Sequence, residues 1–64
     1  MNLIKGLQQE MNRCRELLQE YDAIPQGVFG AMMIRQIIKN AENAIAMGDT
    51  IAMMKSLKEL QGCN

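Results

Sequence analysis

The sequence contains no histidine and no tryptophan, and it has only one tyrosine, one phenylalanine and one proline. Without histidine, the chain lacks the side chain most often used as a general base and as a metal ligand. Its only two cysteines, Cys14 and Cys63, lie far apart in the sequence. A structural zinc site usually needs four nitrogen or sulfur ligands, so two thiols cannot complete one within a chain. We therefore expect no bound metal and no cofactor.

An excess of charge of either sign is also missing, because seven Lys and Arg residues balance seven Asp and Glu residues. No net positive charge draws the chain toward nucleic acid or an acidic membrane. The longest uncharged run, Ala23 to Ile34, is broken by Pro25, Gly27 and Gly30, and no signal-peptide pattern opens the chain. The sequence therefore predicts a cytoplasmic protein that does not span a membrane and whose two thiols are free.

Apolar residues near the start of the chain recur in steps of three and four. They are Ile4, Leu7, Met11, Cys14, Leu18 and Tyr21. This is the spacing of the a and d positions of a coiled coil, and it predicts a helix over residues 2–22 with one apolar stripe. The stripe suits either contact with a second chain or packing inside the same chain.

Two further helices are expected after a turn that contains Pro25, over residues 28–47 and 50–61, within one domain that covers residues 1–64. Gly48 suits a left-handed residue at the end of the second helix, and Asp49 suits the N-cap of the third. The third helix is expected to bury four aliphatic residues, which are Ile51, Met54, Leu57 and Leu60. Cys63 follows it in a tail that we expect to be frayed and exposed.

The small size of the chain favours self-association. At 64 residues, folding buries only about 60% of the surface of the unfolded chain, so the core of a monomer is marginal. Apolar residues make up 48% of the sequence, and seven of them are methionines. We therefore expect an all-α, three-helix protomer that forms a homodimer. The residues expected in its core or interface are Ile4, Leu7, Met11, Leu18, Phe29, Met33 and Ile37.

The small residues Gly27, Gly30 and Ala31 surround the single phenylalanine, Phe29. They suit a notch in which the backbones of two chains cross closely, with Phe29 as an anchor. The alternative interpretation is a flexible turn followed by an ordinary core aromatic residue. The sequence does not decide between the two.

No catalytic constellation accompanies these patterns, since the seven carboxylates fall on polar faces or at helix caps. The sequence therefore predicts a non-enzymatic protein-interaction module. One alternative is a helix-turn-helix DNA-binding regulator that uses Lys55 and Lys58, although Glu59 interrupts their positive charge. Another alternative is a subunit of a hetero-complex, such as an antitoxin or an adaptor.

Residues 27–34, with the sequence GVFGAMMI, and the later Gly48-Asp49 pair followed by Leu57, Glu59 and Leu60 resemble short proteins of lambda-like phages. Those proteins come from the accessory early region between the recombination and excision genes. The resemblance covers about the last two thirds of the chain. It implies a small helical, dimeric phage or prophage protein that alters host physiology by binding a host protein, and it carries over no catalytic residue.

Overall fold

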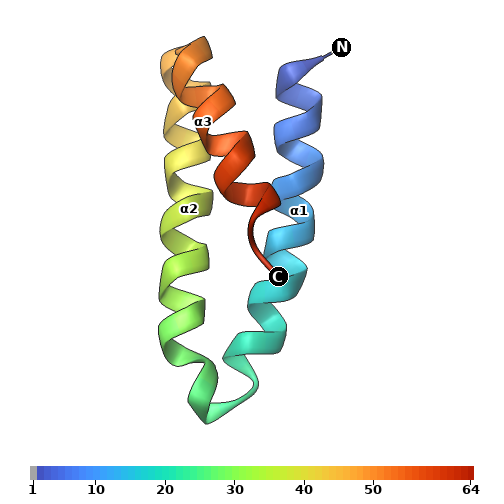
Figure 1. Ribbon diagram of the computed structural model, residues 1–64, viewed down its shortest axis with the longest axis vertical. Coiled ribbons are helices and arrows are strands. Elements are labelled where there is room, and N and C mark those ends of the chain that lie inside the picture. The colour runs from blue at the N-terminus through green and yellow to red at the C-terminus, as the bar shows by residue number, and fades with distance from the viewer. Residues whose placement is uncertain (1) are drawn as a thin grey trace.

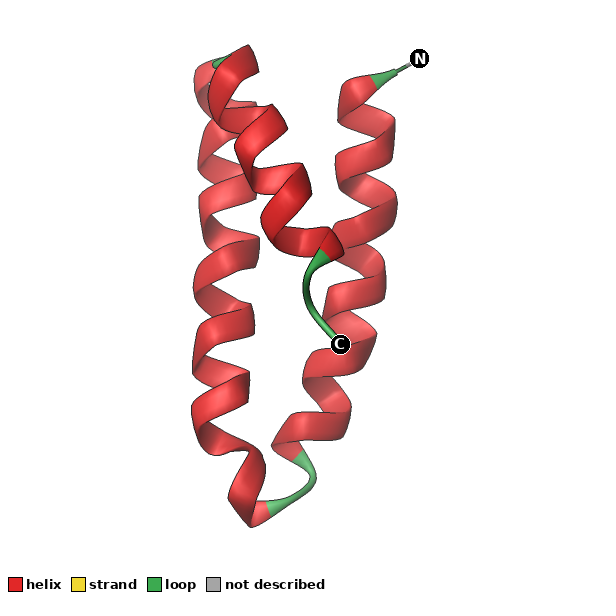
Figure 2. Cartoon of the chain, viewed as in Figure 1, coloured by secondary structure: helices red, strands yellow, loops and turns green. Residues whose placement is uncertain are grey.

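The computed structural model describes residues 2–64, and most of this part of the chain is helical (Figure 2). The elements are α1 (Leu3–Asp22), a short 3-10 helix η1 (Pro25–Gly27), α2 (Val28–Met47) and α3 (Thr50–Gln61). The predicted all-α, three-helix fold is confirmed. In Figure 1, α1 and α2 form an antiparallel hairpin, and α3 folds back along it so that the C-terminus lies beside the middle of α1.

The two ends of α1 are set by local chemistry. Asn2 is the N-cap, and its side-chain oxygen accepts a hydrogen bond from the Lys5 N–H at 3.1 Å. At the other end, Ile24 is extended, with φ −120° and ψ 138°, because the ring of the following Pro25 disfavours helical dihedrals there. Pro25 then lies in the first turn of η1, where a missing N–H costs nothing.

The turn between α2 and α3 follows the prediction made for Gly48 and Asp49. Gly48 adopts the left-handed conformation, with φ 67°. The N–H groups of Gly48 and Asp49 donate to the carbonyl oxygens of Ile45 and Ala44, both at 3.1 Å, which is the pattern of a Schellman motif. The Asp49 side chain caps α3 by accepting a hydrogen bond from the Ala52 N–H at 3.1 Å.

One hydrophobic core lies among the three helices. Its buried members are Leu7, Met11, Cys14, Ile34, Ile38, Ala41, Ala44, Met53, Leu60 and Cys63. The middle of the α1 stripe, Leu7 to Cys14, is therefore covered by helices of the same chain. Within residues 2–64, no helix combines the length and the apolar character needed to cross a membrane.

The face that α3 buries differs from the expected one. Met53, Ser56 and Leu60 are buried, whereas Ile51 is 81% exposed and Met54 is 57% exposed. The buried residues continue to Cys63 in steps of three and four, so they also form one helical stripe. Counting only aliphatic residues missed this stripe because Ser56, a small polar residue, lies in the middle of it. The predicted inward positions of Ile51 and Met54 were wrong.

The helices differ in length, and this difference shapes the molecule. Helices of 20 residues, such as α1 and α2, are about 30 Å long, whereas the 12 residues of α3 span about 18 Å. The described chain measures 36 × 18 × 16 Å. Because α3 starts at the Gly48 turn, it covers the end of the hairpin near that turn and stops before the end near Pro25 (Figure 1).

Candidate functional site: the exposed face of α2

The end of the hairpin near Pro25 is held by close packing around Tyr21. A Cβ atom on Gly27 would lie 2.1 Å from the Tyr21 carbonyl oxygen, and one on Gly30 would lie 3.1 Å from the Tyr21 ring. These two glycines therefore make room for a residue of the same chain. The notch predicted from them is filled from within, and the close approach is between α1 and the start of α2.

Large apolar side chains are exposed on the first two turns of α2. Val28 is 60% exposed, Phe29 is 75% exposed, Met32 is 61% exposed and Met33 is 54% exposed. The interpretation of Phe29 as an ordinary core residue was therefore wrong for the single chain. Monomeric proteins rarely expose neighbouring apolar side chains in this way, and such patches often mark binding surfaces.

Phe29 and Met33 begin a row that runs the length of α2. Its members, which we call the α2 seam, are Phe29, Met33, Gln36, Asn40, Asn43 and Met47, and all are exposed. They are separated by steps of four and three residues, the spacing at which one helix face meets another helix. The two ends of the seam are apolar. Its middle consists of amides, and the Gln36 Nε2 atom donates to the Asn40 Oδ1 atom at 2.9 Å.

The charges beside the apolar end of the α2 seam are paired within the chain. An Arg35 Nη2 atom lies 2.6 Å from an Asp22 Oδ2 atom, and this ion pair joins α2 to the end of α1. Farther along the same side of α2, Arg15 of α1 pairs with Glu42 at 3.4 Å. The seam itself contains no charged side chain, so it presents a neutral surface to a partner.

A shallow groove of about 320 Å³ lies between α2 and the C-terminal residues. Met33 and Ile37 line its α2 side, Tyr21 lies at its α1 end, and Gly62 to Asn64 line the opposite side. The Tyr21 hydroxyl donates a hydrogen bond to the Asn64 carbonyl oxygen. This contact holds the end of the chain beside the apolar end of the seam.

The residues predicted for the core or interface fall into three groups. Leu7 and Met11 are buried in the core of the chain, and Leu18 and Ile37 are half-buried. Ile4, Phe29 and Met33 are exposed, and only the last two lie on the α2 seam. The interface role of the exposed residues stays a prediction. Gln36, Asn40 and Asn43 were missed because a search for apolar residues passes over amides.

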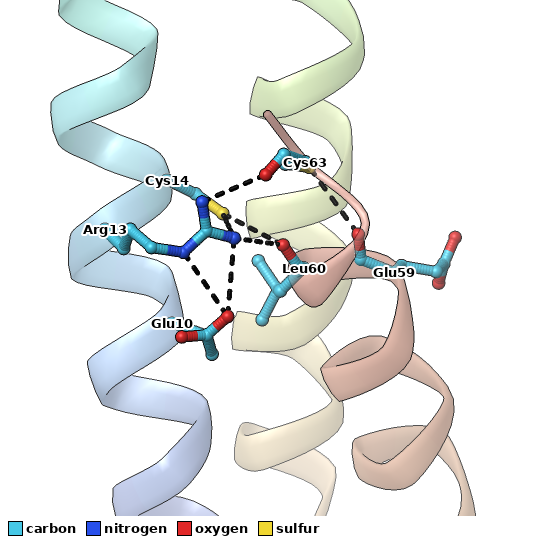
Figure 3. Close-up of polar contacts among 6 residues, drawn as sticks. All are labelled: Glu10, Arg13, Cys14, Glu59, Leu60 and Cys63. Carbon is cyan, nitrogen blue, oxygen red and sulfur yellow. Dashed lines mark hydrogen bonds and ion pairs between the residues drawn. The ribbon is translucent and has the colours of Figure 1, made fainter.

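A second cluster joins α1 to the end of α3, and its centre is Arg13 (Figure 3). The Nη2 atom of Arg13 donates to the Leu60 carbonyl oxygen at 2.7 Å, and Nη1 donates to the Cys63 carbonyl oxygen at 2.9 Å. Glu10 orients the guanidinium group, with its Oε1 atom 3.3 Å from Nη2. The positive charge thus satisfies carbonyl groups at the C-terminal end of a helix, where a cation is favourable.

These contacts of Arg13, which we call the Arg13 clamp, explain why the C-terminal residues are not frayed as predicted. Cys63 is only 8% exposed, so it does not lie in a frayed, exposed end. The sequence places Arg13 on the polar side of an amphipathic helix, and nothing local shows that it reaches residues almost 50 positions away. Cys14, in contrast, is buried as predicted.

Among residues 2–64, no three His, Cys, Asp or Glu side chains are grouped closely enough to hold a metal ion. Buried side-chain nitrogen and oxygen atoms in the same part of the chain all have hydrogen-bond partners. No family model, no curated protein and no solved structure matches the chain.

Proposed function

We propose that this chain is a non-enzymatic protein-interaction module that forms a homodimer through the α2 seam. The observation that carries the proposal is the row of exposed residues at helix-packing spacing, with Phe29 and Met33 at one end and Met47 at the other. Exposed aromatic and methionine side chains are typical of the central part of protein interfaces. The core inside each chain leaves this face of α2 free for a partner.

Several features favour a second copy as the partner. The seam is uncharged, and the chain has no net charge, so two copies approach without strong repulsion. Across a two-fold axis, the same surface meets itself. An ordinary interface takes about 800 Å² from each partner. That is about a sixth of the 4562 Å² surface of one chain, an area that one face of α2 with its flanking residues can supply.

An antiparallel arrangement fits the order of residues along the seam. If two copies of α2 cross near Ile38, Phe29 of each copy lies opposite Met47 of the other, and Gln36 lies opposite Asn40. Phe29 and Met47 then cover each other at both ends, Gln36 and Asn40 meet in the middle, and Met33 lies opposite Asn43. Polar residues at such positions are known to fix register and orientation between helices, at some cost in stability.

The proposal is tested by sedimentation equilibrium on the wild-type chain and on the double variant Phe29→Ser, Met33→Ser. We expect a dimer for the wild type and an increase of at least about tenfold in the dimer dissociation constant for the variant, because interface anchors of this kind contribute more than about 1.4 kcal/mol. The matched control is Met54→Ser, which removes an exposed methionine of α3 outside the seam.

Circular dichroism of each protein separates loss of pairing from loss of fold. We expect the double variant to keep its helicity, because both replaced side chains are exposed in the single chain. A wild-type chain that stays monomeric up to millimolar concentration contradicts the proposal. Equal weakening by the Met54→Ser control also contradicts it, since that residue lies outside the seam.

A further inference from the structure

Two cysteine thiols lie in the core beside the last turn of α3, one from the middle of α1 and one from the residues after α3. The Sγ atom of Cys14 donates to the Leu60 carbonyl oxygen at 3.5 Å, and the Sγ atom of Cys63 donates to the Glu59 carbonyl oxygen, also at 3.5 Å. The two acceptors belong to consecutive residues of the last turn of α3. Both cysteines belong to the same cluster of buried core residues.

The surroundings hold these two thiols in place. Arg13, next to Cys14 in the sequence, bonds the carbonyl oxygens of Leu60 and Cys63, so the backbones that carry the two thiols are already tied together. In Figure 3, Cys14 lies beside the Arg13 guanidinium group, and dashed lines join Cys14 to Leu60 and Cys63 to Glu59. Both residues are buried, with exposed fractions of 0% for Cys14 and 8% for Cys63.

We infer that Cys14 and Cys63 form a dithiol site that low-molecular-weight disulfides, such as oxidised glutathione, convert into an intramolecular disulfide linking α1 to the C-terminus. The bond would join the middle of α1 to the residues that follow α3. This inference is independent of the proposed dimer, because neither cysteine lies on the α2 seam.

The reaction proceeds by two exchanges. The thiolate of one cysteine attacks a sulfur of oxidised glutathione, which breaks the glutathione S–S bond and releases one glutathione thiolate. The thiolate of the other cysteine then attacks the protein sulfur of the mixed disulfide and releases the second glutathione thiolate. Two protein thiols lose their protons, one protein disulfide forms, and one molecule of oxidised glutathione is reduced to two molecules of glutathione.

Cys63 is the natural site of the first exchange, because Cys14 is fully covered. Burial, helped by repulsion from Cys63, raises the pKa of the Cys14 thiol from 9.0 to about 11, against the opposing effect of Arg13. Cys14 is therefore protonated at neutral pH and resists attack by reagents in solution. Its proximity to Cys63 lets it act as the resolving thiol once a mixed disulfide has formed.

The disulfide between Cys14 and Cys63 would stabilise the fold. The loop that the bond closes contains most of the chain, and cross-links that close long loops reduce the entropy of the unfolded state most. For a chain of this size, we expect the disulfide to raise Tm by at least about 10 °C. The bond would also fix Gly62 to Asn64, which line one side of the groove next to Met33.

The test uses the full chain equilibrated with graded ratios of oxidised to reduced glutathione, followed by acid quenching and intact mass measurement. The expected product has lost two hydrogens, carries no glutathione, is not covalently joined to a second chain and has the higher Tm. Cys14→Ala and Cys63→Ala are the matched controls, and neither can form this product. Circular dichroism confirms that each control is folded before its product is compared.

Urea distinguishes a site built by the fold from a chance reaction of an unfolded chain. We expect the glutathione ratio needed for half-conversion to rise at least about tenfold at urea concentrations that unfold the reduced protein, because unfolding separates the two thiols. An unchanged ratio would overturn the inference. So would a folded wild-type protein whose main product is a glutathione adduct or a covalent dimer.

Discussion

The two ends of the α1–α2 hairpin differ in how far their apolar side chains are buried. Near the Gly48 turn, α3 lies over the hairpin, and Leu7 and Leu60 are fully buried. Near Pro25, beyond the end of α3, Phe29 and Met33 remain exposed. The difference follows from helix length, since α3 has 12 residues and each partner has 20. The chain therefore leaves apolar side chains exposed at the end of the hairpin that α3 does not reach.

The largest expected effect is on the covered end. Leu7→Ala should lower the free energy of unfolding by about 2–5 kcal/mol, because it removes a fully buried side chain and leaves a cavity. Phe29→Ala should change the free energy of unfolding of the monomer by less than about 0.5 kcal/mol, because its side chain is exposed. Urea unfolding at a concentration below dimer formation measures both. Similar losses of unfolding free energy for the two variants would contradict the difference in burial between the two ends.

The second-largest expected effect is a dependence of folding stability on pH, at the end of the hairpin that α3 covers. The pKa of Cys14 is raised to about 11 in the folded chain, so the reduced protein binds this proton more tightly than the unfolded chain does. The associated stability is present below pH 9 and is lost as pH rises through 11. The loss amounts to roughly 2–3 kcal/mol, at 1.36 kcal/mol for each pKa unit.

The matched variant for this pH effect is Cys14→Ala, studied under reducing conditions. Its free energy of unfolding should fall less between pH 8 and pH 11 than that of the wild type, since other groups titrate in both proteins. Parallel pH profiles for the two proteins would show that the thiol is not held in its protonated form by the fold.

Opposite effects are expected at two glycines, Gly27 at the Pro25 end of the hairpin and Gly6 near the start of α1. Gly27→Ala should destabilise the chain by about 1–3 kcal/mol, because the added Cβ atom meets the Tyr21 carbonyl oxygen at 2.1 Å. Gly6→Ala should stabilise it by about 1 kcal/mol, because that glycine lies inside α1 and nothing within 4 Å opposes the Cβ atom. Thermal unfolding of both variants decides the sign, and a stabilising Gly27→Ala would refute the close approach.

A smaller effect is expected at the clamp between α1 and α3. Arg13→Ala should cost about 1–2 kcal/mol, because it removes charged hydrogen bonds to two carbonyl oxygens from a side chain that is partly exposed. Hydrogen exchange should locate the loss at residues 60–64, with α2 little affected. Uniformly faster exchange throughout the chain would contradict a local clamp.

The sequence predicted the elements of this fold better than their contacts. Helix ends depend on nearby residues, so Pro25, Gly48 and Asp49 could be read directly from their own chemistry. Contacts between residues far apart in the sequence could not be predicted in this way. For that reason the contact of Arg13 with Cys63, and the burial of Cys63, were missed. The inward face of α3 was wrong because Ser56 was counted as polar although it is small enough to pack between helices.

The candidate site was only partly predictable for a similar reason. Phe29 and Met33 stand out by composition, but whether they are buried depends on where α3 ends. The apolar stripe of α1 was the stronger pattern in the sequence, yet its middle part packs against α2 and α3 of the same chain. The α2 seam does not stand out as an apolar stripe in the sequence, because half of its residues are amides.

The central claim, antiparallel pairing through the α2 seam, is tested most directly by a distance between the two copies. A spin label is placed at Ala46→Cys, an exposed position of α2 outside the seam, in a Cys14→Ala, Cys63→Ala background, and the label-to-label distance is measured by double electron–electron resonance. Residue 46 lies eight positions from the proposed crossing near Ile38, so two copies are expected to place their labels about 25 Å apart. A distance of about 10 Å, as in parallel pairing, or no distance between copies would contradict the claim.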